Sequence, residues 1–453
     1  MPVAEPTIPV RTNDVRVGFF LQTAQWAARW RFARNVATLS LGTALAQSLG
    51  IALAPVLTRL YSPADLGVLG LFMSFVTVAA VATSLSYELG IVSAANQEKA
   101  VRLTWASMLL SAPVCALCGI VLYIVVHFHW LGYGVLPGYS IPLMIVTLLL
   151  IGVFSNLRYW EIRQEHFEII ARTTIIQQAI RSVSQVVLGL FSIGPAGLLF
   201  GEMIGRGAGV GSLFRDAWPA LQSAAARAHR NEMVSALAEN RSLAIYSLPS
   251  SLIDTLASNL PLPLLVQLYG TALGGQFALM QRVLAVPLVL IATSVADTFH
   301  SRLAVCAREK PGQIPGLFAR TSAGMFLLGL GPALILFFAG DRLFALVFGK
   351  PWATAGTLAG ITAPLLLAQM IVNPLSRLVF VLRGQKSKLI YDLTLMTGIL
   401  LVFGVAWYQK LTLVHTVWGI TLVGIFCYIV YYLVLLRIVL RARPDSSTEG
   451  AKS

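Results

Sequence analysis

Residues 103–126 read LTWASMLLSAPVCALCGIVLYIVV, an apolar stretch without a single Asp, Glu, Lys or Arg. An α-helix rises 1.5 Å per residue, so about twenty such residues cross the ~30 Å hydrocarbon core of a bilayer. Similar stretches recur along the whole chain. The twelve predicted spans are residues 36–58, 66–93, 103–126, 140–157, 173–192, 195–214, 243–267, 273–298, 321–340, 354–376, 389–408 and 412–436.

The composition leaves little room for a soluble domain. Hydrophobic residues make up 57% of the chain and charged residues only 11%, whereas soluble proteins carry about 25% charged residues. The sequence therefore predicts an all-α polytopic membrane protein with about twelve transmembrane helices.

The net charge of +14 first suggests a nucleic-acid partner, but the positions of the basic residues indicate topology instead. With the N-terminus placed inside, only Arg59, Arg342, Lys350 and Lys410 fall in external segments, and Arg181 and Arg282 lie within spans. The other basic residues fall in cytoplasmic segments or, for Arg206, in the cytoplasmic half of its span. This bias follows the positive-inside rule, so we expect both termini in the cytoplasm and contact with anionic membrane lipids, not with nucleic acid.

The longest break between spans divides the chain into six spans plus six. The predicted organisation is a basic N-terminal segment at 1–35, a six-helix bundle at 36–214, a cytoplasmic linker at 215–242, a second six-helix bundle at 243–440 and a cytoplasmic tail at 441–453. The N-terminal segment fits either an interfacial helix or a disordered basic tail.

A faint internal repeat relates the two halves. PVLTRLY at 55–61 aligns with PLLVQLY at 263–269, an offset of 208, and the register continues from Gly67 to Gly275. Because six spans separate the copies, both enter the membrane in the same sense. We therefore expect a parallel repeat around an axis along the membrane normal, with a site between the halves.

Several kinds of chemistry are disfavoured. No P-loop is present, because Gly349-Lys350 is followed by Pro351. Gly201-x-x-x-Gly205 is typical of close helix packing, and Cys115-Ala-Leu-Cys118 lies in an apolar span without a second cysteine pair. The six histidines fall at span ends or in loops, and no nucleophile–base pairing is visible. We expect no catalytic residue, cofactor or metal ion.

Polar residues inside spans are more informative, because a charged group at the centre of a membrane helix costs about 2.5–3.5 kcal/mol on insertion scales. Ser247, Ser251, Asp254 and Ser258 follow the spacing of one helical face. This stripe predicts a water-filled cavity, although serines alone could serve helix–helix contact. Asp254 and Arg282 should lie at a similar depth, so we expect them to pair, as a structural pair or as one that an anionic substrate opens.

Other charged residues complete the candidate site. Arg181 and Glu202 fit a structural ion pair or a functional one. The predicted cavity residues are Arg34, Gln47, Arg59, Glu88, Ser247, Ser251, Asp254, Ser258, Arg282 and Asp297.

Several separate motifs resemble one family. They are LTRLYSPADLG at 57–67, Tyr87-Glu88-Leu89, Gln276-Phe277-Ala278-Leu279, Arg282-Val283-Leu284, Phe348-Gly349 and Asn373-Pro374-Leu375-Ser376. In these motifs the chain is similar to bacterial lipid-linked oligosaccharide flippases, the polysaccharide-transporter branch of the superfamily that also contains multidrug and toxin exporters. It departs from that pattern at Ser86, where many relatives have arginine, and at Glu202, where an uncharged amide is expected.

The resemblance implies two six-helix bundles that form a V around a cavity lined by spans one, two, seven and eight. It implies an inner-membrane transporter, not an enzyme, that moves undecaprenyl-pyrophosphate-linked glycans to the outer leaflet by alternating access. Other polysaccharide-assembly membrane proteins are candidate partners. A cation-coupled multidrug exporter of the same architecture is the alternative. A membrane glycosyltransferase or O-antigen polymerase is disfavoured, because no external loop is long enough to build an active site.

Overall fold

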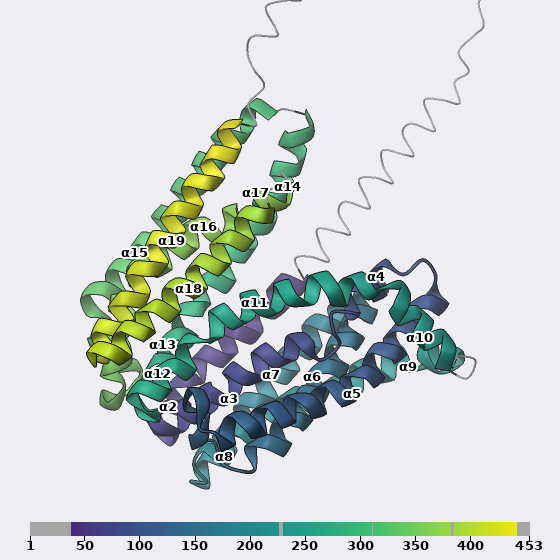
Figure 1. Ribbon diagram of the computed structural model, residues 1–453, viewed down its shortest axis with the longest axis horizontal. Helices are drawn as coiled ribbons and strands as arrows, with labels where there is room; N and C mark the ends of the chain where they lie inside the picture. Colours follow the sequence, from purple (N-terminus) through teal and green to yellow (C-terminus); the bar gives the residue numbers. More distant parts are fainter. Residues whose placement is uncertain (1–37, 226–229, 310, 382–384, 442–453) are drawn as a thin grey trace, which may run out of the picture.

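The computed structural model describes residues 38–225, 230–309, 311–381 and 385–441, and the regular structure in these ranges is entirely helical. Figure 1 shows two helical bundles. The N-terminal bundle contains a helical segment from Thr38 that continues into α2 (Ala54–Leu60), then α3 (Pro63–Ala82), α4 (Glu88–Ser93), α5 (Gln97–His127), η1 (Trp130–Val135), α6 (Ser140–Arg163), α7 (Phe167–Leu190) and α8 (Pro195–Gly207).

Two helices, α9 (Val210–Ala225) and α10 (Arg230–Glu239), lead to the C-terminal bundle. That bundle contains η2 (Leu243–Ser247), α11 (Leu248–Asn259), α12 (Pro261–Tyr269), α13 (Thr271–Pro287), η3 (Leu288–Ala292), α14 (Thr293–Glu309), η4 (Pro311–Gln313), α15 (Ile314–Phe348), η5 (Lys350–Trp352), α16 (Ala353–Leu375), α17 (Leu378–Val381), α18 (Gln385–Gln409) and α19 (Leu413–Arg441).

Eight helices in the described ranges are long and apolar enough to cross a membrane, and they coincide with predicted spans one to four and nine to twelve. Predicted spans five to eight are also helical, but they are short, interrupted or polar. For example, α8 has 13 residues. One π-helical turn begins span seven, and another interrupts span eight. Broken membrane helices are tolerated where they are buried in protein or line a cavity. The polar site is therefore expected among these four elements.

The local sequence determines both ends of α3. The Ser62 hydroxyl accepts a hydrogen bond from the Asp65 amide, the Asp65 carboxylate accepts one from the Ser62 amide, and Pro63 occupies the first turn. This capping box starts the helix. The predicted continuous span over 66–93 is wrong at its end, because α3 stops at Ala82. Leu85 and Ser86 then adopt left-handed conformations, with φ of 48° and 63°, before α4 begins.

The internal repeat is visible where α3 meets α13. A Cβ atom at Gly67 would overlap the carbonyl oxygen of Thr271, and one at Gly275 would overlap the carbonyl oxygen of Pro63. The offset of 208 relates Pro63 to Thr271 just as it relates Gly67 to Gly275, so the two contacts are equivalent. Reciprocal contacts of this kind mark a two-fold interface, and only glycine allows the backbones to approach so closely.

A second pair of contacts repeats across the same junction. The Ser74 hydroxyl of α3 donates to the carbonyl of Asn259 at 3.3 Å. The guanidinium of Arg282, at the repeat-related position in α13, donates to the carbonyl of Gly50 at 3.2 Å. The repeat therefore places a serine in one half where the other half has an arginine.

The repeat-related tyrosines occupy equivalent places within their own bundles. The Tyr61 hydroxyl donates to the carbonyl of Gln185 at 2.7 Å, and the Tyr269 hydroxyl donates to the carbonyl of Leu411 at 2.9 Å. Gln185 belongs to the fifth predicted span of the first bundle, and Leu411 lies two residues after α18, which forms the fifth predicted span of the second bundle. The register deduced from the sequence is correct at these positions.

Reciprocal loop contacts close one end of the junction. The Trp352 indole nitrogen donates to the carbonyl of Thr58 at 3.0 Å, and the Gly132 amide donates to the side-chain oxygen of Gln267. A turn of each bundle, η1 or η5, thus bonds to the first span of the other bundle. Trp352 is fully buried in this position.

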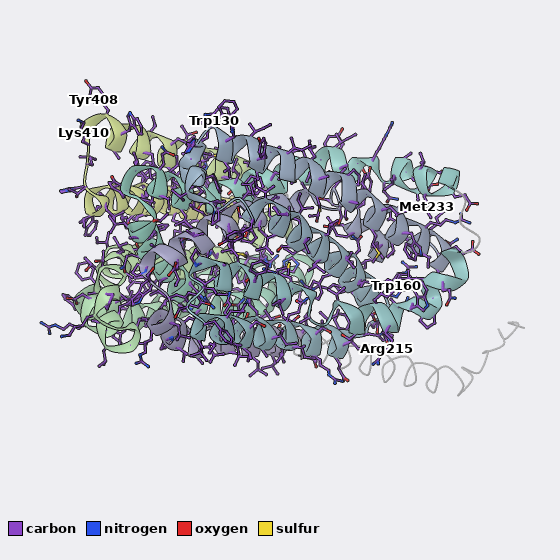
Figure 2. All side chains as sticks on the ribbon, turned by 90° about the horizontal axis from the view of Figure 1, so that it is seen from below. Trp130, Trp160, Arg215, Met233, Tyr408 and Lys410 are labelled. Atoms are coloured by element: carbon purple, nitrogen blue, oxygen red, sulfur yellow. The ribbon has the colours of Figure 1, made fainter. Side chains whose placement is uncertain are left out.

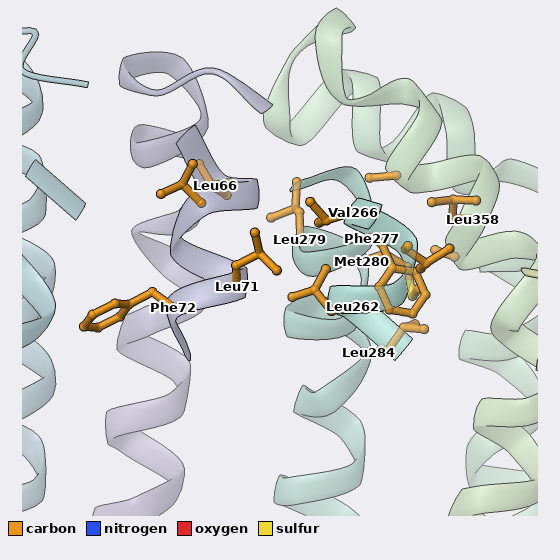
Figure 3. Close-up of a cluster of buried hydrophobic side chains, with 14 of the residues drawn as sticks. Leu66, Leu71, Phe72, Leu262, Val266, Phe277, Leu279, Met280, Leu284 and Leu358 are labelled. Atoms are coloured by element: carbon orange, nitrogen blue, oxygen red, sulfur yellow. The ribbon is translucent and has the colours of Figure 1, made fainter. Parts of the chain in front are cut away.

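The apolar core continues across the junction. Leu66 and Leu71 of α3 belong to the same buried cluster as Leu262 of α12 and Met280 of α13, as Figure 3 shows. Burying apolar surface stabilises the folded state by roughly 25 cal/mol per Å². The bundles are therefore held together here by apolar packing.

Away from this junction the bundles diverge. Figure 1 shows α14 and α17 far from α4 and α10, whereas α2, α3, α12 and α13 lie together. Figure 2 shows that Trp130 and Lys410 lie at one end of the molecule, and Arg215 and Met233 toward the other. The charge pattern predicts that the first end faces outward and the second faces the cytoplasm.

Candidate functional site

A polar cavity of about 220 Å³ lies beside the junction. Its polar lining residues are Gln47, Gln178, Arg181, Gln185, Glu202 and Arg282. A neighbouring cavity of about 170 Å³ shares three of these residues, Gln47, Gln178 and Arg181, and adds Thr43, Thr174, Gln177 and Arg206. We treat the two as one site, called the arginine cavity below. Most of its lining belongs to the N-terminal bundle, and α13 of the other bundle supplies Arg282.

Two glycines of α8 position the arginine on α7. A Cβ atom at Gly205 would overlap the side chain of Arg181, and one at Gly201 would come within 2.5 Å of the Gln185 side chain. The Gly201-x-x-x-Gly205 motif therefore packs α8 closely against α7, as its spacing predicts. This contact brings Arg181 next to Glu202.

Glu202 bridges two arginines in this site. Its carboxylate accepts a hydrogen bond from Nε of Arg206 at 2.8 Å and from Nη1 of Arg181 at 3.2 Å. The Glu202 side chain is 4% exposed, whereas Arg181 and Arg206 are 25% and 31% exposed. A buried carboxylate needs such partners, because an unpaired buried charge is strongly unfavourable. The expected ion pair of Arg181 and Glu202 is confirmed.

Arg282 differs from the other two arginines. Its guanidinium lines the cavity and donates to the carbonyl of Gly50, and it forms no ion pair with any acidic side chain in the described part of the chain. With every group ionised, three arginines face one glutamate, so the site has an excess of positive charge. Arginine presents a planar set of donors that matches carboxylate and phosphate oxygens.

Of the predicted site residues whose side chains are described, the structure brings two, Gln47 and Arg282, into the arginine cavity. Arg59 is exposed in the last turn of α2. Glu88 begins α4 and is half-buried, and its Oε2 has no hydrogen-bond partner among the described residues. Arg34 lies outside the described residues, as does the side chain of Asp297 in α14.

The polar stripe of span seven does not line the arginine cavity. Ser251, Asp254 and Ser258 are exposed on α11, and Ser247 is half-buried at the end of η2. The Ser258 hydroxyl donates to the carbonyl of Asp254 within the same helix, at 3.0 Å. The sequence analysis predicted that these four residues line the substrate cavity. In the structure they lie outside the arginine cavity.

The predicted pairing of Asp254 with Arg282 is wrong. Asp254 instead accepts a hydrogen bond from Nζ of Lys388 at 3.1 Å, and Lys388 also bonds Asp392 at 2.7 Å. Depth along a helix does not determine the direction in which a side chain points. Here α11 presents Asp254 to α18, whereas α13 presents Arg282 to the N-terminal bundle.

The sequence analysis overlooked the amides of α7. Gln177, Gln178 and Gln185 all lie in predicted span five, and each lines the arginine cavity. Gln177 donates to the carbonyl of Arg206 at 3.0 Å. Three glutamines in one membrane span are a visible signal, because amides are costly in hydrocarbon. Together with Arg181 they could have indicated span five as a cavity wall.

Comparison with known proteins agrees with this architecture. Residues 56–356 match the family described as polysaccharide biosynthesis protein. No curated protein matches the chain in sequence. The fold is similar to that of lipid II flippase MurJ in an inward closed conformation, with a TM-score of 0.68 and 12% identity over 89% of this chain and 90% of that one.

Two MATE transporters also share the fold. A MATE family transporter of the MOP superfamily, in an inward-facing conformation, gives a TM-score of 0.63 with 15% identity over 88% of this chain and 96% of that one. The Vibrio cholerae MATE transporter VcmN, as a D35N mutant, gives a TM-score of 0.55 with 13% identity over 93% and 99%. These similarities concern the fold. Because the family match spans more than half of the sequence, this multi-pass membrane protein belongs to the polysaccharide biosynthesis protein family.

Proposed function

We propose that the protein is a flippase of the bacterial inner membrane. It moves undecaprenyl-pyrophosphate-linked oligosaccharide repeat units from the cytoplasmic to the periplasmic leaflet, for the synthesis of O-antigen, capsule or exopolysaccharide. The observation that carries this proposal is the arginine cavity, where three arginines face a single glutamate.

The charge of the cavity supports an anionic substrate. Glu202 already accepts hydrogen bonds from Arg181 and Arg206, so those arginines have partners. Arg282 has only a backbone carbonyl as its bonded acceptor among the described residues. A pyrophosphate oxygen would give this guanidinium a charged acceptor, and hydrogen bonds to charged groups contribute about 1.5–3 kcal/mol each.

The arrangement of the bundles supports alternating access. Reciprocal loop contacts close one end, and the bundles diverge toward the other. With the positive-inside topology, the diverging end opens to the cytoplasm, where the substrate is made. Transport would then require the junction of α3 and α13 to open while the opposite end closes.

The charge also argues against a cation-coupled multidrug exporter. A cavity for cationic drugs needs unpaired acidic groups, whereas Glu202, the one acidic residue among the described residues that line this cavity, is held by two arginines. Drug-efflux assays on cells that express the protein test this alternative, and we expect no added resistance.

Deletion of the gene tests the proposed function. We expect lipid-linked repeat units to accumulate in the cytoplasmic leaflet and surface polysaccharide to be lost. Complementation with Arg282→Gln should restore little transport, whereas Arg59→Gln, which alters an exposed arginine away from the cavity, should restore it fully. If the deletion strain still displays normal polysaccharide and accumulates no lipid-linked intermediate, the proposal is incorrect.

A further inference from the structure

Three potential metal ligands converge outside the arginine cavity. Glu161 lies in the last turn of α6, His166 directly precedes α7, and Asp216 belongs to α9. Nδ1 of His166 lies 2.8 Å from Oε2 of Glu161 and 3.4 Å from Oδ2 of Asp216. All three potential ligand atoms lie within 4.8 Å of one another. Spacing along the chain does not predict this cluster, because Asp216 comes from a distant helix.

Glu161 is the unusual member of the cluster. Its side chain is 1% exposed, and its Oε1 has no hydrogen-bond partner among the described residues. A buried carboxylate oxygen without a partner is costly. The cluster therefore contains acceptor capacity, at its buried member Glu161, that the described protein atoms leave unused.

The arginine next to this cluster in the sequence does not compensate for the carboxylate. Arg163, two residues along the chain, turns its guanidinium to the carbonyls at the end of α4, including those of Ile91 and Ala94, at 3.1 and 2.7 Å. Asp216 adds a second negative charge to the cluster. Two carboxylates that share a site repel each other unless a proton or a cation lies between them.

The turn between α6 and α7 fixes two of the three ligands. The His166 amide donates to the carbonyl of Glu161 at 3.0 Å, and Glu165 between them adopts a left-handed conformation with φ of 62°. The third ligand comes from α9, the first of the two helices that lead to the other bundle. An ion at this position would therefore fasten α9 to the N-terminal bundle.

We propose that Glu161, His166 and Asp216 bind a divalent transition-metal ion, with Zn²⁺ as the best match. Zn²⁺ prefers imidazole nitrogen and carboxylate oxygen at about 2.0–2.2 Å in a tetrahedral arrangement, with water as a possible fourth ligand. Ligand atoms around such an ion are about 3.4 Å apart. The contact of His166 with Asp216 already has this length, and that of His166 with Glu161 needs to open by about 0.6 Å to reach it.

Metal binding to the purified full-length protein tests the site. The protein is prepared in detergent with an affinity tag that contains no histidine, and is then titrated with Zn²⁺ against a competing chelator. Co²⁺ serves as a second probe, because tetrahedral coordination gives it a strong visible absorption. We expect about one Zn²⁺ per chain, and a rise in the thermal unfolding midpoint, because an ion that binds only the folded state stabilises it.

Two variants and one control decide the outcome. Asp216→Asn and His166→Gln change side chains that are 42% and 50% exposed, so both proteins should fold. Each should weaken Zn²⁺ binding at least tenfold, since loss even of groups outside the coordination sphere typically costs about 10–100-fold in metal affinity. His129→Gln, an exposed histidine in another turn, should have no effect. Absence of saturable binding, or wild-type affinity in either ligand variant, would contradict the proposal.

Discussion

Glu202→Gln should destabilise the protein by about 3 kcal/mol. The variant removes the charged acceptor that Arg206 and Arg181 share at 2.8 and 3.2 Å. Breaking a buried ion pair by removing one partner typically costs 3–5 kcal/mol. We expect the lower end of that range, because both guanidinium groups keep some contact with solvent.

Thermal unfolding in detergent, followed by the loss of monodisperse protein, measures this effect. Glu168→Gln is the matched control, because Glu168 is exposed in the first turn of α7. Loss of that acid near a helix N-terminus should cost no more than about 1 kcal/mol. The double variant Glu202→Gln/Arg206→Gln should recover part of the lost stability, since it removes one charge of each sign. An unchanged unfolding midpoint for Glu202→Gln would show that the buried pair does not hold α7 and α8 together.

Three further predictions follow from the fold. Gly275→Ala should separate α3 from α13 and reduce transport and stability, because its Cβ would overlap the Pro63 carbonyl. Gly324→Ala, whose Cβ would meet no atom within 4 Å, should be tolerated. Equal behaviour of the two variants in unfolding and transport assays would contradict the close contact of α3 with α13. Asp254→Asn should change the free energy of unfolding by at most about 1 kcal/mol, since its pair with Lys388 is exposed, and a larger loss would indicate a structural role. Reporter fusions should place loops 127–139 and 340–353 outside and residues 215–242 inside; an external linker would overturn the charge-based topology.

Most of the fold could be predicted from hydrophobic patterning and the internal repeat. Eight apolar spans are confirmed, and the repeat register correctly relates Gly67 to Gly275 and Tyr61 to Tyr269. Length and hydrophobicity are sufficient for these features, because a membrane helix must satisfy its backbone polar groups internally.

The site was less predictable, because it depends on how helices rotate and where they break. Asp254 and Arg282 have similar predicted depths, yet they face different partners, Lys388 and the Gly50 carbonyl. The left-handed conformations of Leu85 and Ser86, in the turn between α3 and α4, also have no clear signal in the sequence. By contrast, Gly201 and Gly205 did indicate close packing, and Arg181 and Glu202 did form the pair that their positions suggested.

Direct binding of undecaprenyl pyrophosphate to the purified protein tests the role of the arginine cavity. The lipid is titrated into wild-type protein, Arg282→Gln and Arg59→Gln in detergent at fixed ionic strength. Loss of one hydrogen-bonded charge contact of about 1.5–3 kcal/mol corresponds to roughly tenfold weaker binding or more. We expect Arg282→Gln to show this loss and Arg59→Gln to bind like wild type. Equal affinity of all three proteins would contradict the assignment of the cavity as the site that receives the pyrophosphate.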